Sequence, residues 1–450
     1  MTHNITLILD RKELTMANYY NVPVAGIDVA ANFSVVTILS PNGDIYKKNL
    51  KFHHNLDGLT KLVNLINKIE EEFGDSPKLF CESTGIYHLT LLHFLRKNQK
   101  DISVINPLIS NSNRNFNIRK VKNDKRDSLS LAKLGKFDNV KTSMDIPEDF
   151  LHLRFLVREY YNRIDDRANV KKEFSNSLNV YYPGLKKAFS NICSKTALAF
   201  FENYPTPQSF IDAVQDDVIH LLRTTAKCGL EWSNKKYLEL LQIANEALFL
   251  GINSFFFARK VTRFLASYKF HTELIDDLYA EINVYINNAD FGAKFHEDLD
   301  LLSSFKGLGS MTAITLLSAI GSIDNFSKPQ QLVAFFGVDP SVNESGKFKG
   351  DKNKMSKRGT SIGRKVLYSF ALQCIRKSPN QKPVNSTLHH YYHEQLKHKK
   401  KKVRVVAVMN KLLRYVFSVL KNRNPYVVRD PKIHKRMFLE NNSKKNILAA

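Results

Sequence analysis

The chain has 450 residues, of which 43% are hydrophobic and 24% are charged. This balance excludes a wholly disordered protein, and the length allows about two to four domains, each with its own core. The chain has 67 Lys and Arg against 43 Asp and Glu, a net charge of +24. Such a charge favours a polyanionic partner, of which nucleic acid is the commonest. An anionic membrane surface is the alternative, although no apolar run approaches the roughly 20 residues that span a bilayer.

The cysteines and the N-terminus indicate a reducing compartment. The four cysteines lie far apart, with no Cys-x-x-Cys pair, at Cys81, Cys193, Cys228 and Cys374. This spacing argues against a disulfide framework and against a zinc site, and it is typical of a cytoplasmic protein. The early run "ITLIL" is too short for the apolar region of a signal peptide. The chain has neither GxxxxGK[ST] nor GxGxxG, so nothing indicates nucleotide hydrolysis.

Residues 21–147 read as an α/β domain that follows an N-terminal extension, residues 1–20. The runs "VPVAGIDVA", "FSVVTIL" and "IYKKNLKF", with a turn at "PNGD", predict a three-stranded antiparallel meander. A helix is expected from about Leu56 to Phe73, where apolar residues recur at helical spacing. "PKLFCE" and "DISVINP" predict two more strands, and a helix follows each of them. The predicted order is β-β-β-α-β-α-β-α.

The next section, residues 148–297, is predicted to be a long helical or coiled-coil region. The stretch from "FLHLRF" to "NVYY" reads as one long helix, and helical patterning resumes from about Lys235 to Ala293. An insertion at about 184–230 looks less regular, and we assign it no role. Paired long helices usually serve as spacers, coiled-coil arms or dimerisation elements.

Residues 298–425 are predicted to form a second compact, mainly α-helical domain, followed by a tail, residues 426–450. "LLSSFKGLGSMTAITLLSAIG" reads as helix, Gly-Leu-Gly turn and helix, similar to helix-hairpin-helix elements that bind phosphate with backbone N–H groups. The signal is weak alone, because glycine turns between helices are common. The run "KHKKKKVR" is either a solvated face or a nucleic-acid contact, and the overall charge favours contact.

Two acids in a basic stretch, "NDKRDSLSLAKL", raise the question of function. Asp124 and Asp127 lie one helical turn apart, on a stripe that continues through Leu131 and Leu134. Two unpaired anions on such a stripe are costly to bury unless a cation neutralises them. A solvated helix start is the simpler alternative, since acids favour the first helical turn.

Two further acids, at the ends of predicted strands, suggest how Asp124 and Asp127 could be neutralised. Asp28 falls at the end of the first strand and Glu82 at the end of the fourth, which such a meander can place beside the first. Four acids, Asp28, Glu82, Asp124 and Asp127, would then meet at one place. Hard divalent ions coordinated by oxygen would neutralise them, and paired ions are used repeatedly for displacement at phosphodiesters.

The order of these motifs resembles a transposase family. "GIDVA", "CESTGIY", "VINP" and "NDKRDSLSLA" resemble the RuvC-like, RNase H-like domain of the DEDD insertion-sequence recombinases (insertion-sequence family one-ten). The block "FKGLGSMTAITLLSAIGSIDNFSKPQQLVAFFGVDPSVNESG" and the following "MSKRGTSIGRKVLY" resemble the C-terminal transposase domain of that family. The resemblance covers roughly residues 20–140 and 298–425.

The resemblance implies a mechanism and partners. Asp28, Glu82, Asp124 and Asp127 would bind magnesium, and Ser345 in "NESG" would be the nucleophile that forms a 5′-phosphoserine link to DNA. A serine hydroxyl needs activation by a base or a metal. The partners implied are donor and target double-stranded DNA, a structured non-coding guide RNA (the bridge RNA), and further copies of the chain. These copies would form a dimer or tetramer with composite active sites, in a bacterial cytoplasm and associated with the nucleoid.

Basic residues around Ser345 are expected to hold phosphates. They are Lys347, Lys349, Lys352, Lys354, Lys357, Arg358 and Arg364. The family typically has a small polar residue and an arginine after its Ser-Gly step, whereas "KFKG" follows here. Lysine binds phosphate as a point charge, without the bidentate fork of arginine.

The sequence is compatible with three functions. The first is an RNA-guided DNA transposase or recombinase that uses the acids and Ser345 together. The second is a metal-dependent RuvC-like nuclease or hydrolytic transposase without a covalent serine link. The third is a nucleic-acid-binding protein without catalysis, which the four acids speak against. We expect the first.

Overall fold

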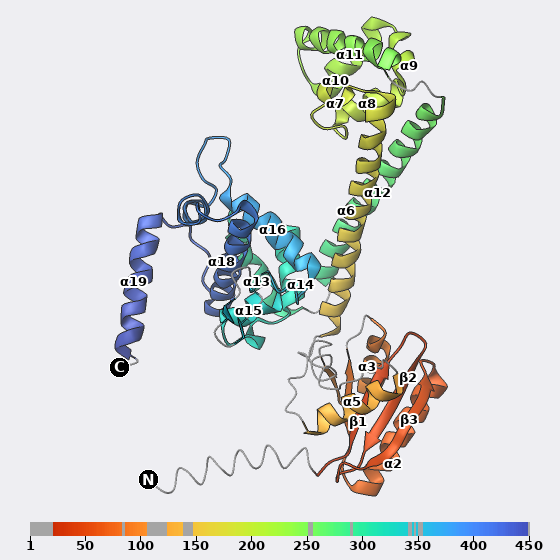
Figure 1. Ribbon diagram of the computed structural model, residues 1–450, viewed down its shortest axis with the longest axis vertical. Coiled ribbons are helices and arrows are strands. Elements are labelled where there is room, and N and C mark those ends of the chain that lie inside the picture. Colours follow the sequence, from red (N-terminus) through yellow and green to blue (C-terminus); the bar gives the residue numbers. More distant parts are fainter. Residues whose placement is uncertain are drawn as a thin grey trace. The chain divides into compact units, whose positions relative to one another are not determined.

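The computed structural model describes residues 21–82, 86–105, 124–137, 147–250, 255–288, 291–340, 344–345, 348–349 and 354–448. The chain divides into two compact units, Met1–Asp145 and Ile146–Ala450 (Figure 1). Each unit is described by itself. The expected extension, residues 1–20, lies outside the described residues.

The N-terminal unit is built on a mixed five-stranded sheet with the order β3-β2-β1-β4-β5. The strands are β1 (Val24–Val29), β2 (Phe33–Leu39), β3 (Ile45–His53), β4 (Lys78–Glu82) and β5 (Ile102–Ile105). The helices described in this unit are α2 (Leu56–Phe73), α3 (His88–Lys97) and α5 (Asp124–Phe137). The first three strands form an antiparallel meander, and β4 and β5 continue the sheet in parallel with β1. The predicted α/β order of strands and helices is confirmed.

The two faces of the sheet have different coverings. Alternate residues of a strand point to opposite faces, and Ala25, Ile27 and Val29 of β1 pack with apolar residues of α2 and α3. The other face, with Val24 of β1 and Phe80 of β4, packs against Leu131 and Leu134 of α5. Helix α5 therefore covers the face that also carries the even-numbered residues of β1 and β4.

Helix α5 approaches the sheet at backbone distance because two positions lack a side chain. A Cβ atom on Gly26 of β1 would collide with the α5 backbone at Ser128 and Ala132. A Cβ on Gly135 of α5 would collide with the ring of Phe80. Glycine is required where two backbones approach as closely as at Gly26. At Gly135 it leaves room for the ring of Phe80.

Two polar contacts fix the direction of α5. The Ser128 hydroxyl lies 2.8 Å from that of Thr37 in β2, and both are buried. At the other end of the helix the buried Lys136 donates to the backbone carbonyls of Val22 and Pro41, at 2.7 and 2.8 Å. Burial lowers the pKa of Lys136, and the two carbonyls compensate its lost hydration. Because Lys136 contacts the chain just before β1, the first turn of α5 lies toward the end of β1.

The C-terminal unit begins with two long helices that pack side by side, α6 (Glu148–Tyr181) and α12 (Phe255–Asn288) (Figure 1). The predicted single long helix after residue 147 is thus confirmed. Ring contacts pair the helices in antiparallel order, with Tyr160 against Tyr279 and Phe174 stacked on Phe264 at 3.8 Å.

The section expected to be less regular, 184–230, consists of short helices separated by turns. Its helices, with the one that follows, are α7 (Leu185–Ala188), α8 (Lys195–Asn203), α9 (Pro207–Ile211), α10 (Gln215–Ala226) and α11 (Leu230–Leu250). They enclose an aromatic core that includes Phe200, Phe201 and Phe210 together with Phe174 of α6. The helices α7 and α9, with four and five residues, are too short to show a helical period.

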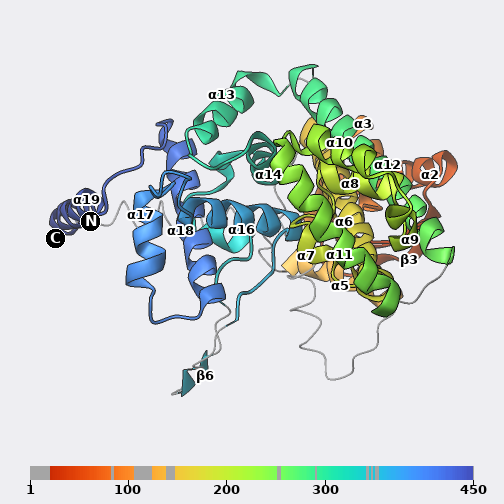
Figure 2. The ribbon, with the colours of Figure 1, turned by 90° about the horizontal axis from the view of Figure 1, so that it is seen from above.

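The remaining chain forms a helical bundle that contains a small hairpin. Its elements are α13 (Gly292–Ser303), α14 (Ser310–Ile320), η1 (Ile323–Asn325), α15 (Pro329–Phe335), β6 (Glu344–Ser345), β7 (Phe348–Lys349), α16 (Ser361–Ile375), α17 (Ser386–His390), η2 (Tyr391–Gln395), α18 (Lys401–Asn422) and α19 (Pro431–Leu448). The helices α16 and α18 lie side by side (Figure 2). The predicted helix, Gly-Leu-Gly turn and helix are present, with Gly307 at φ +90°. The residues predicted as a tail include α19.

Within the described part of the chain, no helix has the length and apolar character that crossing a bilayer requires.

We predict that Gly26→Ala destabilises the N-terminal unit. The added methyl group would displace the α5 backbone, and overpacking of this kind costs about 1–3 kcal/mol. Chemical denaturation followed by circular dichroism measures the change. Gly229→Ala is the control, because a Cβ atom there meets nothing within 4 Å. Equal stability of the two variants would contradict the close approach.

Candidate functional site

Two of the predicted acids lie side by side on neighbouring parallel strands. In the register of β1 and β4, Gly26 lies opposite Phe80 and Ile27 opposite Cys81. Continued by one residue, this register brings Asp28 beside Glu82, and paired residues of parallel strands share a face. Both acids therefore lie at the carboxyl ends of their strands, on the face that α5 covers. Cys81 lies on the opposite face, where burial raises its pKa to about 12.

The third acid, Asp127, lies on α5 directly before Ser128. The contact between Ser128 and Thr37 places this turn of the helix over β2, and Gly26 places it over β1. Since α5 runs opposite to β1, its first turn points toward the strand ends that carry Asp28 and Glu82. Asp124 is the first residue of the same helix, and its side chain lies outside the described residues.

The three carboxylates differ in their exposure to water. Glu82 is 3% and Asp127 is 8% exposed, whereas Asp28 is half-buried. Carboxylate oxygens are the ligands that hard divalent cations such as magnesium prefer. Among the side chains that the structure describes, however, no three from His, Cys, Asp and Glu stand close enough to hold a metal ion. A metal role for the four acids thus stays a prediction.

The candidate nucleophile Ser345 lies in the C-terminal unit, on a two-stranded hairpin. Ser345 of β6 pairs with Phe348 of β7, and its side chain lies outside the described residues. The base of this hairpin is held together by backbone pairing of Pro340 with Met355. A further bond runs from the Ser356 N–H to the Asp339 carbonyl, at 2.9 Å. The structure therefore presents Ser345 on a strand with an anchored base.

The basic residues predicted to hold phosphate fall into three groups. Lys347 and Lys352, and the side chain of Lys349, lie outside the described residues. Lys354, Lys357 and Arg358 are exposed at the end of the hairpin segment. The third group is Arg364 alone.

Arg364 differs because its guanidinium is used within the protein. It donates from Nη1 to the backbone carbonyls of Gly359 and, at 3.3 Å, Phe336. Burial lowers its pKa. Its geometry indicates that it holds the two chain segments that flank the hairpin. Binding of nucleic acid by Arg364 stays a prediction.

The lysine run before α18 is also anchored by an arginine. Arg404 donates from Nε to the Lys399 carbonyl at 2.6 Å and from Nη2 to the Lys397 carbonyl at 2.7 Å. Lys399 and its lysine neighbours are exposed. The arrangement is compatible with the expected contact to nucleic acid.

Sequence reasoning missed the residues that position the acids. Gly26, Ser128 and Lys136 determine where α5 lies, yet each looks ordinary in the sequence. The available signal was the glycine inside the apolar run "VAGIDV", since an isolated glycine in a strand indicates close backbone approach.

Two family models match the chain. Residues 25–183, which include all four acids, match a model described as a transposase, the DEDD transposase of IS110 elements. Residues 299–386, which include Ser345 and the predicted basic residues, match the model "Transposase IS116/IS110/IS902 family". The class defined by both matches is that of transposases. More specifically, the two matched segments are similar to transposase domains of the IS110 family.

The chain is also similar to two curated proteins. The "Transposase for insertion sequence element IS1111A" of Coxiella burnetii is 32% identical over 111 residues, which is 25% of this chain and 30% of that protein. The chain thus spans less than a third of this relative. The "Pilin gene-inverting protein" of Moraxella bovis is 21% identical over 413 residues, 91% of this chain and 98% of that protein.

We predict that Arg364 and Lys357 respond differently to substitution. Arg364→Gln should lower the free energy of unfolding by about 1–3 kcal/mol, because bonds to a charged donor are lost. Lys357→Gln should leave stability unchanged and make the salt dependence of DNA binding shallower, by about 0.9 in the log–log slope. Thermal unfolding and binding titrations test both. The reverse pattern would contradict these assignments.

Proposed function

We propose that this chain is an insertion-sequence transposase that cleaves and rejoins DNA with a metal-dependent carboxylate site and a serine nucleophile. The observation that carries the proposal is the placement of Asp28 beside Glu82, on the sheet face that α5 covers with Asp127. The matches of both domains to IS110-family transposases and the net charge of +24 support it. An RNase H-like, RuvC-like fold for the N-terminal unit is part of the proposal, supported by the mixed sheet with its antiparallel meander.

The donor set at the strand ends fits a divalent metal. Asp28, Glu82, Asp124 and Asp127 would hold magnesium, since all four carry the hard oxygen donors that this ion prefers. Bound there, magnesium would supply electrophilic activation of a phosphodiester. The sheet would hold Asp28 and Glu82 in register, and the contacts of α5 would hold Asp127 against them.

Ser345 would carry out the covalent step. Its hydroxyl oxygen would form a bond to a DNA phosphorus, the bond to the 3′ oxygen would break, and the serine proton would leave to a base while the 3′ oxygen gains one. The products are a 5′-phosphoserine link and a free 3′ hydroxyl, which can attack the link to rejoin DNA. The anchored base of the hairpin supports this role, because a nucleophile has to be held in position.

The partners we propose follow from the resemblance and the charge. They are donor and target double-stranded DNA, a structured bridge RNA that pairs with both, and further copies of this chain in a dimer or tetramer. In this assembly the acids of one subunit and Ser345 of another would complete each active site. The proposal includes a location in a bacterial cytoplasm, on the nucleoid.

Ser345→Ala is expected to abolish protein-linked DNA. Without the hydroxyl no phosphoserine bond can form, so denaturing gels should show no covalent complex and no strand exchange. Ser303→Ala, at the exposed end of α13, is the control and should retain both. Continued cleavage by Ser345→Ala would favour a hydrolytic nuclease or transposase instead.

Asp127→Asn is expected to reduce cleavage about a thousandfold, because several kcal/mol of metal-dependent stabilisation would be lost. Magnesium at about 100 times its dissociation constant should stabilise the unsubstituted chain by about 2.7 kcal/mol, and Asp127→Asn should lose this effect. Calorimetry with and without magnesium measures it. The control is Asp57→Asn, an exposed acid paired with Lys61 at 2.8 Å. Equal magnesium stabilisation of the two variants would argue against a metal site at Asp127.

A further inference from the structure

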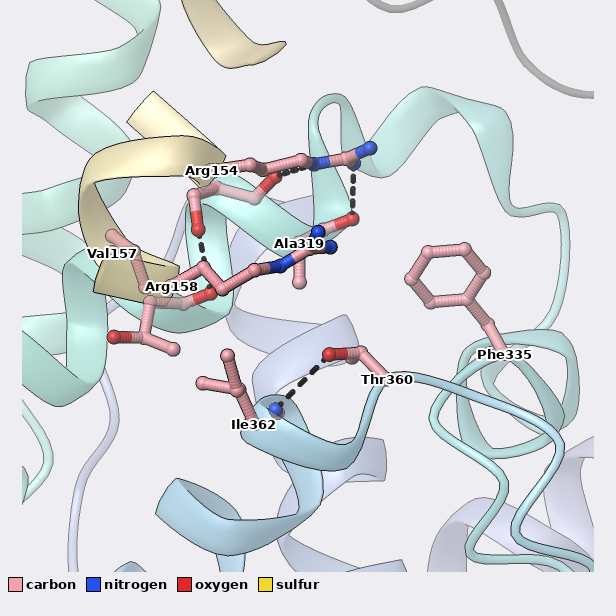
Figure 3. A pocket seen from close by; sticks show the side chains of 10 residues that line it. Arg154, Val157, Arg158, Ala319, Phe335, Thr360 and Ile362 are labelled. Carbon is pink, nitrogen blue, oxygen red and sulfur yellow. Dashed lines mark hydrogen bonds between the residues drawn. The ribbon is translucent and has the colours of Figure 1, made fainter. Parts of the chain in front are cut away.

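A pocket of about 170 Å³ lies in the C-terminal unit where α6, α14 and α16 meet (Figure 3). Its polar side is formed by Arg154 and Arg158 of α6. The opposite side is formed by Phe335, Thr360 and Ile362, at the end of α15 and the start of α16. We call it the arginine pocket.

Arg154 forms part of the frame of the pocket. Its guanidinium donates from Nε to the Ser318 carbonyl and from Nη2 to the Ala319 carbonyl, at 2.7 Å for the latter (Figure 3). These carbonyls belong to the last turn of α14, where a cation is favourable. Burial and the nearby Arg158 lower the pKa of Arg154 to about 10, so it stays charged at neutral pH.

Arg158 adds a second positive charge to the same pocket. It lies one helical turn after Arg154, and its side chain is exposed. Neither residue takes part in any salt bridge formed among the described residues. Like charges four residues apart destabilise a helix, and no acid whose side chain the structure describes forms a salt bridge with this pair. An anion bound in the pocket would offset it.

The opposite wall restricts the kind of anion. Phe335 and Ile362 present apolar surface beside the two guanidinium groups, and Thr360 adds a hydroxyl whose oxygen accepts from the Gly363 N–H at 3.3 Å. A phosphodiester has this combination of features, since its charged phosphate is joined to the apolar face of a sugar. Guanidinium groups bind phosphate strongly, because they are always charged and can donate two parallel hydrogen bonds.

The pocket lies at the root of the hairpin that carries Ser345. Phe335 and Thr360 stand just outside the two ends of the hairpin segment. These ends are joined by the Lys357 N–H, which donates to the Gly337 carbonyl at 3.1 Å. They are packed so closely that a Cβ on Gly359 would collide with the backbone of Phe335. A phosphate in the pocket would thus be held at a fixed place relative to the base of the hairpin.

We propose that the arginine pocket binds a backbone phosphate of duplex DNA and so positions the strand relative to the hairpin of Ser345. This inference rests on the proposed function and deepens it by naming where the C-terminal unit holds its substrate. Arg158 makes the direct contact with the phosphate. Arg154 holds the last turn of α14 against α6 and adds a second positive charge.

The test is DNA binding by Arg158→Gln in buffer that contains EDTA, where no cleavage takes place. The loss of one phosphate contact should make the slope of the logarithm of the association constant against the logarithm of salt concentration shallower by about 0.9. Lys172→Gln is the matched control. It removes one exposed positive charge from the same helix, about 21 Å further along its axis, and should leave the slope unchanged. Arg158→Lys keeps a point charge and should restore the slope.

The outcomes separate the pocket from the proposed function. An unchanged slope in Arg158→Gln, with Ser345-dependent cleavage intact, would overturn the pocket alone. If Arg158→Gln changes the salt-dependence slope for an RNA duplex but not for a DNA duplex, the assignment of the pocket to DNA would be overturned. Failure of the unsubstituted chain to bind DNA would overturn both. Because Arg158 is exposed and its loss removes a like-charge pair, its variants should unfold at no lower temperature than the unsubstituted chain, and this measurement accompanies each titration.

Discussion

The backbone-to-backbone approach of α5 and β1 at Gly26 is the constraint on which the candidate active site depends. The sheet by itself brings Asp28 beside Glu82, because β1 and β4 pair in parallel in a register that, continued by one residue, sets these two positions opposite each other. The turn of α5 that carries Asp127 lies over the sheet because the helix packs against Gly26, which has no side chain. The Ser128–Thr37 contact and the carbonyls around Lys136 then set the direction of the helix. The positions of the acids on the sheet and the helix thus depend on Gly26, Ser128 and Lys136, to which we assign no catalytic role.

Much of the N-terminal unit could be predicted from its sequence, because its elements are long enough to show their periods. The meander, the helix Leu56–Phe73 and the position of Asp28 and Glu82 at strand ends all follow from apolar runs bounded by turns. The helices α7 and α9, with four and five residues, could not be predicted in this way, since about one turn carries no readable period. Their order comes from the aromatic core they share with Phe174, which is a property of tertiary packing.

In the candidate site, too, some properties of single residues can be predicted from the sequence and others cannot. Charge alone identifies Lys357 and Arg364 equally as phosphate ligands, yet Arg364 donates to two carbonyls of its own chain whereas Lys357 is exposed. Arg154 and Arg158 are far in sequence from the predicted basic residues. The packing of α6 on α14 and α16 brings the two arginines near the base of the hairpin that carries Ser345. Which cations face outward depends on neighbours that the sequence does not reveal.

The length of α6 has a mechanical consequence. Near the start of α6, Arg154 donates hydrogen bonds to the last turn of α14. Near its other end, Phe174 packs in the aromatic core with residues of α8. A helix of 34 residues is about 51 Å long, so a tilt of about 5° at one end would displace the other by roughly 4 Å. The length of α6 would therefore convert a small tilt near the arginine pocket into a displacement of several ångströms at its other end.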